Sequence, residues 1–178
     1  MRFYGDGCVI LLYPTGESRA INISYDLNAP YYLSYYLDED RSTEYKLVQM
    51  SQGDKSWPRL HLAYWKTYWD KTAHRGSWDP QQDIIHEQDF MKPWSHFNYN
   101  DSGPSAIIIA TDGLDSFKYK KSEYLNYTHT LSDVTSFKNW TGEFLKRRMN
   151  KVMKENAEGV ITPVDDIAMA VLVNEERL

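Results

Sequence analysis

Two aspartates stand where apolar strands are expected to end and to begin. Asp112 follows the apolar run in SAIIIATDG, and Asp165 precedes the apolar segment Ile167 to Val173. If these two strands are antiparallel neighbours, the end of one lies beside the start of the other, and the two carboxylates meet at one edge of the sheet. Carboxylate oxygens on rigid elements suit Mg²⁺ and Mn²⁺. A bound metal of this kind supplies a nucleophilic water and polarises a phosphoryl oxygen.

A third aspartate has a similar position. Asp6 lies in Gly5-Asp6-Gly7, directly before another apolar segment, and Gly113 after Asp112 would let backbone approach closely. Each feature also has a purely structural explanation, because Asp-Gly after a strand is a common turn and an Asp-Asp pair before a strand is often a solvated cap. Each alone is structural more often than not. The combination of all three is more specific for metal chemistry.

The elements that must position these residues are strands and one helix. Turn residues Pro14-Thr15-Gly16 separate two strand-like segments and predict a β-hairpin. The partner on the other side of the first strand must then come from later in the chain or from elsewhere. The pattern as a whole predicts an α+β fold with a mainly antiparallel sheet. The expected elements are strands over Cys8–Tyr13, Arg19–Ser24, Glu44–Ser51, the apolar run after Ser105 and Ile167–Val173, and one long amphipathic helix over Ser132–Glu155.

The middle of the chain, residues 52–103, is rich in tryptophan and broken by glycine and proline. Within it, Phe90 to Tyr99 contains a proline and is expected to be an edge strand or a loop. The stretch Trp57 to Lys71 interleaves aromatic and basic residues, a pattern found where single-stranded nucleic acid stacks. Core or subdomain packing is favoured instead, because the chain carries a net charge of −5.

Composition narrows the class of protein. The 178 residues are 42% hydrophobic and 25% charged, as in a folded domain, and suggest a single domain. Cys8 is the one cysteine, so an internal disulfide or a cysteine-rich zinc site is excluded. No apolar run approaches the length of a membrane span, and the first residues do not form a signal peptide. We therefore expect a cytoplasmic protein that binds neither membrane nor nucleic acid.

Three segments resemble the metal-dependent serine/threonine protein phosphatases of type 2C. They are TDGL after AIIIA, DDIAMAVLV near the C-terminus, and YGDGCVILLYPTG at the start. The resemblance covers roughly residues 3–24 and 105–173. It implies an antiparallel β-sandwich of two sheets flanked by helices. It also implies a binuclear Mn²⁺ or Mg²⁺ centre that activates water for attack on a phosphoserine or phosphothreonine of a protein substrate.

The resemblance also implies roles for individual residues. Asp112 and Asp165 match the family's metal-binding aspartates, and Asp166 matches the Asn or Asp that usually follows the second of them. Asp6 matches an aspartate of an additional, weaker metal site. The family often has a further aspartate three residues after the glycine of the Asp-Gly motif. Here that position is Ser116, with Asp115 one place earlier.

The family's early motifs are absent from the sequence. They include an Asp-Gly-x-Gly-Gly segment, and they provide the aspartate that bridges both metals and an arginine for the phosphate. We therefore expect a partial phosphatase domain over residues 1–178: a fragment, half of a split enzyme, or a degenerate relative. Each would leave the binuclear centre incomplete, and a domain cut at its start would also leave one sheet edge bare. Residues 52–103 would be the family's variable flap.

An alternative from another class of function is a non-catalytic module with a phosphatase-like fold. In that interpretation the aromatic middle of the chain binds a protein partner. Metal binding separates the two interpretations, because only the phosphatase requires it.

Overall fold

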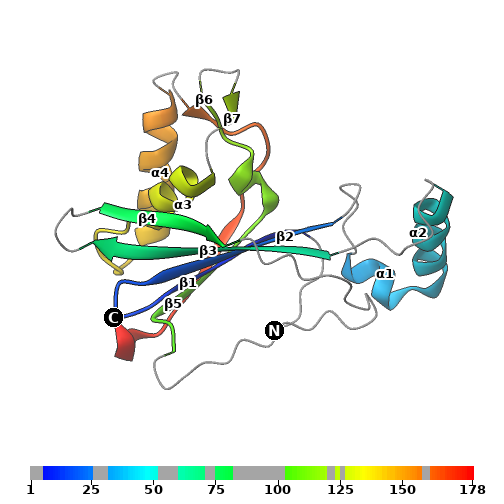
Figure 1. The fold of residues 1–178 in the computed structure, drawn as a ribbon, viewed down its shortest axis with the longest axis horizontal. Coiled ribbons are helices and arrows are strands. Elements are labelled where there is room, and N and C mark those ends of the chain that lie inside the picture. The colour runs from blue at the N-terminus through cyan, green and yellow to red at the C-terminus, as the bar shows by residue number, and fades with distance from the viewer. Residues whose placement is uncertain are drawn as a thin grey trace.

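The structure is a computed structural model that describes residues 6–25, 32–51, 60–70, 75–81, 103–119, 123–124, 127–157 and 161–178. Figure 1 shows a twisted sheet with α3 and α4 over one face and with α1 and α2 beside one end. The helices are α1 (Leu33–Leu37), α2 (Glu39–Ser51), α3 (Tyr127–Thr135) and α4 (Phe144–Ala157), with short 3₁₀ helices at Asp112–Asp115 and Glu175–Arg177. The strands are β1 (Gly7–Leu12), β2 (Ser18–Tyr25), β3 (Leu60–Asp70), β4 (Arg75–Gln81), β5 (Ala106–Ala110), β6 (Lys118–Tyr119), β7 (Glu123–Tyr124), β8 (Ile161–Thr162) and β9 (Met169–Val173).

Six strands form the main sheet, in the order β4-β3-β2-β1-β5-β9, and every neighbouring pair is antiparallel. The predicted hairpin of β1 and β2 is confirmed. The other side of β1 pairs with β5, which comes from later in the chain as expected. A second, small sheet has the order β7-β6-β8. The α+β class with an antiparallel sheet is therefore confirmed.

The core lies on both faces of β1, whose six residues are all buried. On one face, Ile10 and Ile108 pack with Leu131 and Val134 of α3. On the other face, Val9 and Leu11 join a cluster that includes aromatic residues of β2 and α2. Alternation of side chains across a strand explains this division, because residues two apart share a face. A continuous apolar run such as CVILL is what a strand covered on both faces requires.

The strand predicted over Glu44–Ser51 is wrong, because these residues belong to α2. The amides of Asp40 and Arg41 donate to Asp38 Oδ1 at 3.0 and 3.1 Å, which caps the start of this helix. Among its described side chains, Ser42 and Tyr45 are buried, at 8% and 9% exposure, while Leu47 and Val48 are exposed. The alternation of polar and apolar residues in EYKLVQMS does not correspond to two faces of a sheet.

The single helix predicted over Ser132–Glu155 is also wrong, because α3 ends at Thr135 and α4 begins at Phe144. The Thr135 and Ser136 hydroxyls donate to the carbonyls of Leu131 and Ser132, at 2.7 and 2.6 Å, as the first helix ends. Gly142 then adopts φ +57°, a left-handed conformation that breaks a helix. Both helices still turn apolar residues towards the core, so the predicted apolar face exists but is shared between α3 and α4.

The last strand differs from the prediction in its burial. The segment Ile167–Val173 was expected to form a buried strand, but β9 is an edge strand with alternating exposure. Leu172 is 66% exposed, on the same face as Ile109 of β5, which is 44% exposed. The apolar run gave no sign of this, because run length does not report how many neighbours a strand has.

In the middle of the chain, β3 and β4 form a hairpin that extends the main sheet beside β2, and the sequence had not predicted either strand. The prediction for Phe90–Tyr99 lies outside the described residues. Among the described residues, no helix is both long enough and apolar enough to cross a membrane.

Candidate functional site

The sheet brings the three predicted aspartates to one end. Ala110 at the end of β5 pairs with Met169 at the start of β9, so the segments carrying Asp112 and Asp165 are adjacent. Cys8 pairs with Ala110 on the other side of β5, which places Asp6 at the same end. The two strands next to Asp112 and Asp165 are thus antiparallel neighbours, which is the condition under which the sequence analysis expected the two residues to meet at one edge.

One threonine ties these segments together. The Thr111 hydroxyl donates to the Asp166 carbonyl at 3.2 Å and accepts the Ala168 amide at 3.0 Å. The Thr111 amide also donates to the Ala168 carbonyl at 3.0 Å. These three bonds continue the β5–β9 pairing past the end of β5, so they hold the residue directly before Asp112 beside the chain directly after Asp165.

A serine makes a second link. The Ser116 hydroxyl donates to the Gly113 carbonyl at 2.7 Å and accepts the amides of Val164 and Asp165, at 3.3 and 3.1 Å. The sequence had marked Ser116 as the position where a further aspartate was expected. Here it connects the 3₁₀ helix that begins at Asp112 to the backbone of Asp165.

Gly113 is required by a close approach of backbone. A Cβ atom at this position would overlap the carbonyl oxygen of Asp166. The expectation that Gly113 allows backbone to approach closely is thus met, and the backbone that approaches is that of Asp166. Neither Thr111 nor Ser116 was predicted as a positioning residue. The only sequence signal was a hydroxyl residue on each side of the Asp-Gly pair.

The carboxylates at this end repel one another. Burial raises the pKa of Asp6, and the charges of Asp112 and Asp165 raise it further, against a backbone hydrogen bond that lowers it. Asp112 and Asp165 are exposed, whereas Asp6 is half-buried. The three predicted metal ligands therefore share one electrostatic environment.

A fourth carboxylate, Asp115, belongs to the same group. Burial raises its pKa most, Asp112 and Asp6 raise it further, and a hydrogen bond from Asn22 lowers it. The Asn22 amide lies 3.5 Å from Asp115 Oδ2. Asn22 of β2 pairs with Cys8 of β1, so the hairpin register could have indicated that it lies at this end. The sequence analysis missed it.

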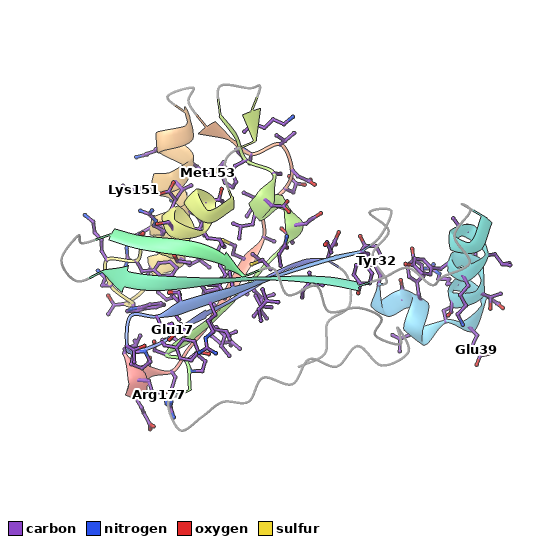
Figure 2. All side chains as sticks on the ribbon, viewed as in Figure 1. Glu17, Tyr32, Glu39, Lys151, Met153 and Arg177 are labelled. Atoms are coloured by element: carbon purple, nitrogen blue, oxygen red, sulfur yellow. The ribbon has the colours of Figure 1, made fainter. Side chains whose placement is uncertain are left out.

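Two tyrosines lie within the field of these charges. Burial, followed by the charge of Asp6, raises the pKa of Tyr25 to about 12. Tyr32, directly before α1 (Figure 2), has a raised pKa through burial and the charges of Asp6 and Asp112. Its side chain is about half exposed.

The site concentrates the negative charge of four aspartates, Asp6, Asp112, Asp115 and Asp165. Within the described part of the chain, none of these four aspartates forms an ion pair with a basic side chain. No three His, Cys, Asp or Glu side chains of the described residues are arranged to hold a metal ion as they stand. Asp165 Oδ1 instead accepts the Asp166 amide at 2.8 Å. The arrangement attracts cations, but ligation would need side chains to rotate.

Comparison of the chain with protein-family models, with curated proteins and with solved structures gives no match.

Proposed function

We propose that the chain is the later part of a type 2C-like phosphatase domain. Such a domain hydrolyses phosphoserine or phosphothreonine in proteins with the help of Mn²⁺ or Mg²⁺. The observation that carries the proposal is the convergence of Asp6, Asp112 and Asp165 at one end of three adjacent strands. In the proposed β-sandwich, the six-stranded sheet is one of two layers. The exposed Ile109 and Leu172, on the face away from α3, support that arrangement.

The donor set fits a hard divalent cation, because it consists of carboxylates without basic partners in the described structure. Asp112 and Asp165 would hold the metal, with Asp6 at a weaker additional position and Asp166 beside them. When bound, the metal supplies a nucleophilic water and polarises the phosphoryl oxygen. The chain's own contribution is positional, since Thr111 and Ser116 fix the separation of the two aspartate-bearing segments.

Binding of Mn²⁺ tests the proposal directly. Calorimetry on the full chain stripped with EDTA is expected to show Mn²⁺ binding that Asp112→Asn weakens at least ~10-fold, as loss of a metal-ligand contact typically does. Asp40→Asn removes the same charge from α2 and is expected to leave Mn²⁺ binding unchanged. Equal weakening by both variants would show that only net charge matters, and the proposed site would be wrong.

Hydrolysis is a separate question. The bridging aspartate and the phosphate-binding arginine of the family's early motifs have no counterpart in this sequence. We therefore expect no Mn²⁺-dependent hydrolysis of p-nitrophenyl phosphate by the 178-residue chain alone. Hydrolysis that Asp112→Asn abolishes would show that the centre is complete after all.

A second candidate function is a non-catalytic interaction module. It is favoured by one observation, that the described carboxylates do not form a preassembled metal site. Its partner surface would include the hairpin of β3 and β4, in which Trp65, Trp69 and Trp78 lie. Absence of any Mn²⁺ heat, with no change on Asp165→Ala, would favour this module over the phosphatase.

A further inference from the structure

A basic pocket lies between the α3–α4 connection and the first turns of α4. Its volume is about 470 Å³, and four cationic and two aromatic side chains line most of it. No carboxylate of the described residues contributes to its lining. The chain as a whole has a net charge of −5, so this concentration of positive charge is a local feature. The six side chains are Lys138, Arg147, Arg148, Lys151, Phe137 and Phe144.

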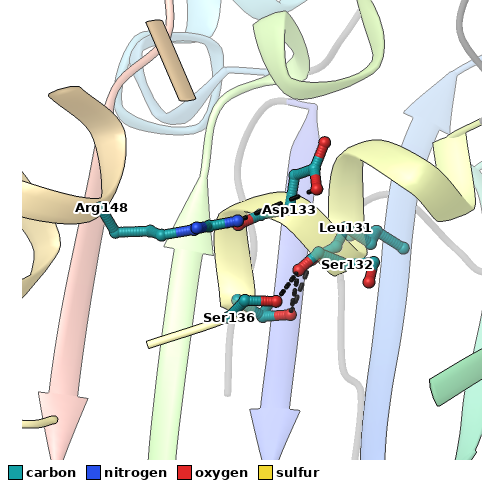
Figure 3. A network of polar contacts seen from close by, with 6 residues as sticks. Leu131, Ser132, Asp133, Ser136 and Arg148 are labelled. Carbon is teal, nitrogen blue, oxygen red and sulfur yellow. Dashed lines mark hydrogen bonds and ion pairs between the residues drawn. The ribbon is translucent and has the colours of Figure 1, made fainter. Parts of the chain in front are cut away.

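One arginine of the pocket, Arg148, is held in place by α3. The Arg148 guanidinium donates from Nε to the Asp133 carbonyl, and its Nη2 lies 3.8 Å from Asp133 Oδ1 (Figure 3). The Arg148 side chain is only 11% exposed. The Arg148 guanidinium is therefore held in one position in the pocket wall, and Asp133 offsets part of its charge.

Arg147 and Lys138, also in the lining, have no acidic partner among the described residues. Arg147 Nη2 donates to Asn139 Oδ1 at 2.8 Å and to the Thr141 carbonyl at 2.7 Å, and both acceptors are neutral. Lys138 is exposed and forms no ion pair with any described carboxylate. Lys146, one residue before Arg147, lies outside the lining and is 3.3 Å from Glu143.

The aromatic wall of the pocket is rigid. The rings of Phe137 and Phe144 meet edge to face at 5.2 Å, and Trp140 packs 4.8 and 5.3 Å from them. Three aromatic rings in mutual contact lose little further freedom when a ligand binds. An apolar group on the ligand would rest against Phe137 and Phe144.

We propose that this pocket binds a phosphorylated serine or threonine in a peptide segment of another protein. The phosphate would lie between Lys138 and Arg147, and an apolar neighbour in the peptide would contact the aromatic wall. A phosphate carries close to two negative charges and three acceptor oxygens, so it suits several converging cations better than a carboxylate does. An extended nucleic acid needs a long basic track, which this single local pocket on an acidic chain does not offer.

This inference goes beyond the proposed function, because it concerns binding without hydrolysis. None of the pocket residues is one of the aspartates proposed to hold a metal. Working in EDTA separates the two, since metal-dependent hydrolysis cannot then remove the phosphate. Failure of this binding would leave the metal proposal standing, and failure of the metal proposal would leave the pocket standing.

The test is fluorescence anisotropy with the full chain in EDTA. The probe is a fluorescein-labelled nine-residue peptide with one phosphoserine followed by phenylalanine, compared with its serine and glutamate versions. We expect the phosphorylated peptide to bind at least ~10-fold more tightly than the other two. Lys138→Gln should weaken its binding about fivefold, because an exposed charge-assisted bond is lost. Lys146→Gln removes the same charge from α4 outside the pocket and should leave the affinity within about twofold.

Three results would overturn the proposal. They are equal binding of the phosphorylated and serine peptides, equal weakening by Lys138→Gln and Lys146→Gln, and tighter binding of an oligouridylate than of the phosphopeptide. Lys138 is exposed and forms no ion pair with a carboxylate of the described residues, so Lys138→Gln is expected to fold. Circular dichroism of each variant confirms that its fold is intact.

Discussion

The hydroxyl groups of Thr111 and Ser116 hold the two aspartate-bearing segments together. Thr111 and Ser116 bond to the backbone of the segment 164–168, so neither aspartate side chain has to hold the other in place. This leaves the side chains of Asp112 and Asp165 exposed at the surface. A site that must attract a cation gains from such an arrangement, because the backbone segments that carry the carboxylates are held together before the cation arrives.

Replacing Thr111 tests this role. Thr111→Val keeps the shape of the side chain but leaves the Ala168 amide without its acceptor and the Asp166 carbonyl without its donor. We expect the free energy of unfolding to fall by about 1–2 kcal/mol in urea denaturation. Thr43→Val on the exposed side of α2 is the control, with an expected change under about 0.5 kcal/mol. Equal losses in the two variants would contradict the positional role of Thr111.

Gly113 offers a second test at the same scale. Gly113→Ala places a methyl group against the Asp166 carbonyl, so backbone must move and the expected loss is about 2–4 kcal/mol. Gly142→Ala is the matched change, because Gly142 has φ +57° but its nearest neighbour is the flexible end of Arg147 at 3.6 Å. Its expected loss is only about 1 kcal/mol. A larger loss for Gly142→Ala, measured by the same denaturation, would show that the backbone approach at Gly113 is not constraining.

At the scale of elements, the site depends on the register of β1, β5 and β9. The sequence predicted β1, β2 and β5 well, because apolar runs there are bounded by turn residues such as Pro14, Gly16 and the Asp112-Gly113 pair. It also indicated that Asp112 and Asp165 would share one sheet edge if their strands were antiparallel neighbours, as β5 and β9 are. Short-range patterns are enough where each strand begins and ends with a clear signal.

The same sequence patterns gave the wrong secondary structure where tertiary contacts and local hydrogen bonds determine it. The alternation in EYKLVQMS fits a strand as well as a helix, and the capping residue Asp38 lies outside that window. The break between α3 and α4 depends on hydroxyl bonds and on one glycine within an otherwise helical pattern. Asp115 and Asn22 joined the site only through the hairpin register, since 93 positions separate them in the chain.

Adjacent isoleucines of β5 test the assignment of its faces. Ile108 is 0% exposed in the cluster beneath α3, whereas Ile109 is 44% exposed on the opposite face. We expect Ile108→Ala to lower the free energy of unfolding by about 3–4 kcal/mol and Ile109→Ala by about 1 kcal/mol. Urea denaturation followed by circular dichroism measures both. The reverse order would mean that β5 is turned by one residue, which would also move Asp112 to the other face.

For the whole molecule, charge is separated into two regions. Aspartates gather at one end of the sheet, while four basic side chains line the α3–α4 pocket. Burial and mutual repulsion make Asp6 and Asp115 harder to ionise in the folded chain than in the unfolded one. The metal-free protein is therefore less stable at neutral pH than it would be without this repulsion.

The pH dependence of stability has a definite sign. Raised pKa values mean that the folded chain binds more protons than the unfolded chain just above the ordinary value of 3.8. The contribution of these carboxyls to stability therefore falls as pH rises through that window, and it stays low at neutral pH.

Neutralising one of these carboxyls should reduce the repulsion and raise the stability of the folded chain at neutral pH. In EDTA at pH 7, Asp115→Asn is expected to raise the melting temperature by about 1–2 °C, as for a modest surface-charge term, and the gain should vanish near pH 3.5. Asp40→Asn should instead lower the melting temperature slightly, because negative charge in the first turn of α2 favours the helix dipole. A lower melting temperature for Asp115→Asn at pH 7 would mean that the hydrogen bond from Asn22 outweighs the repulsion. The aspartates would then form a stabilising hydrogen-bond network rather than a site that a cation is needed to stabilise.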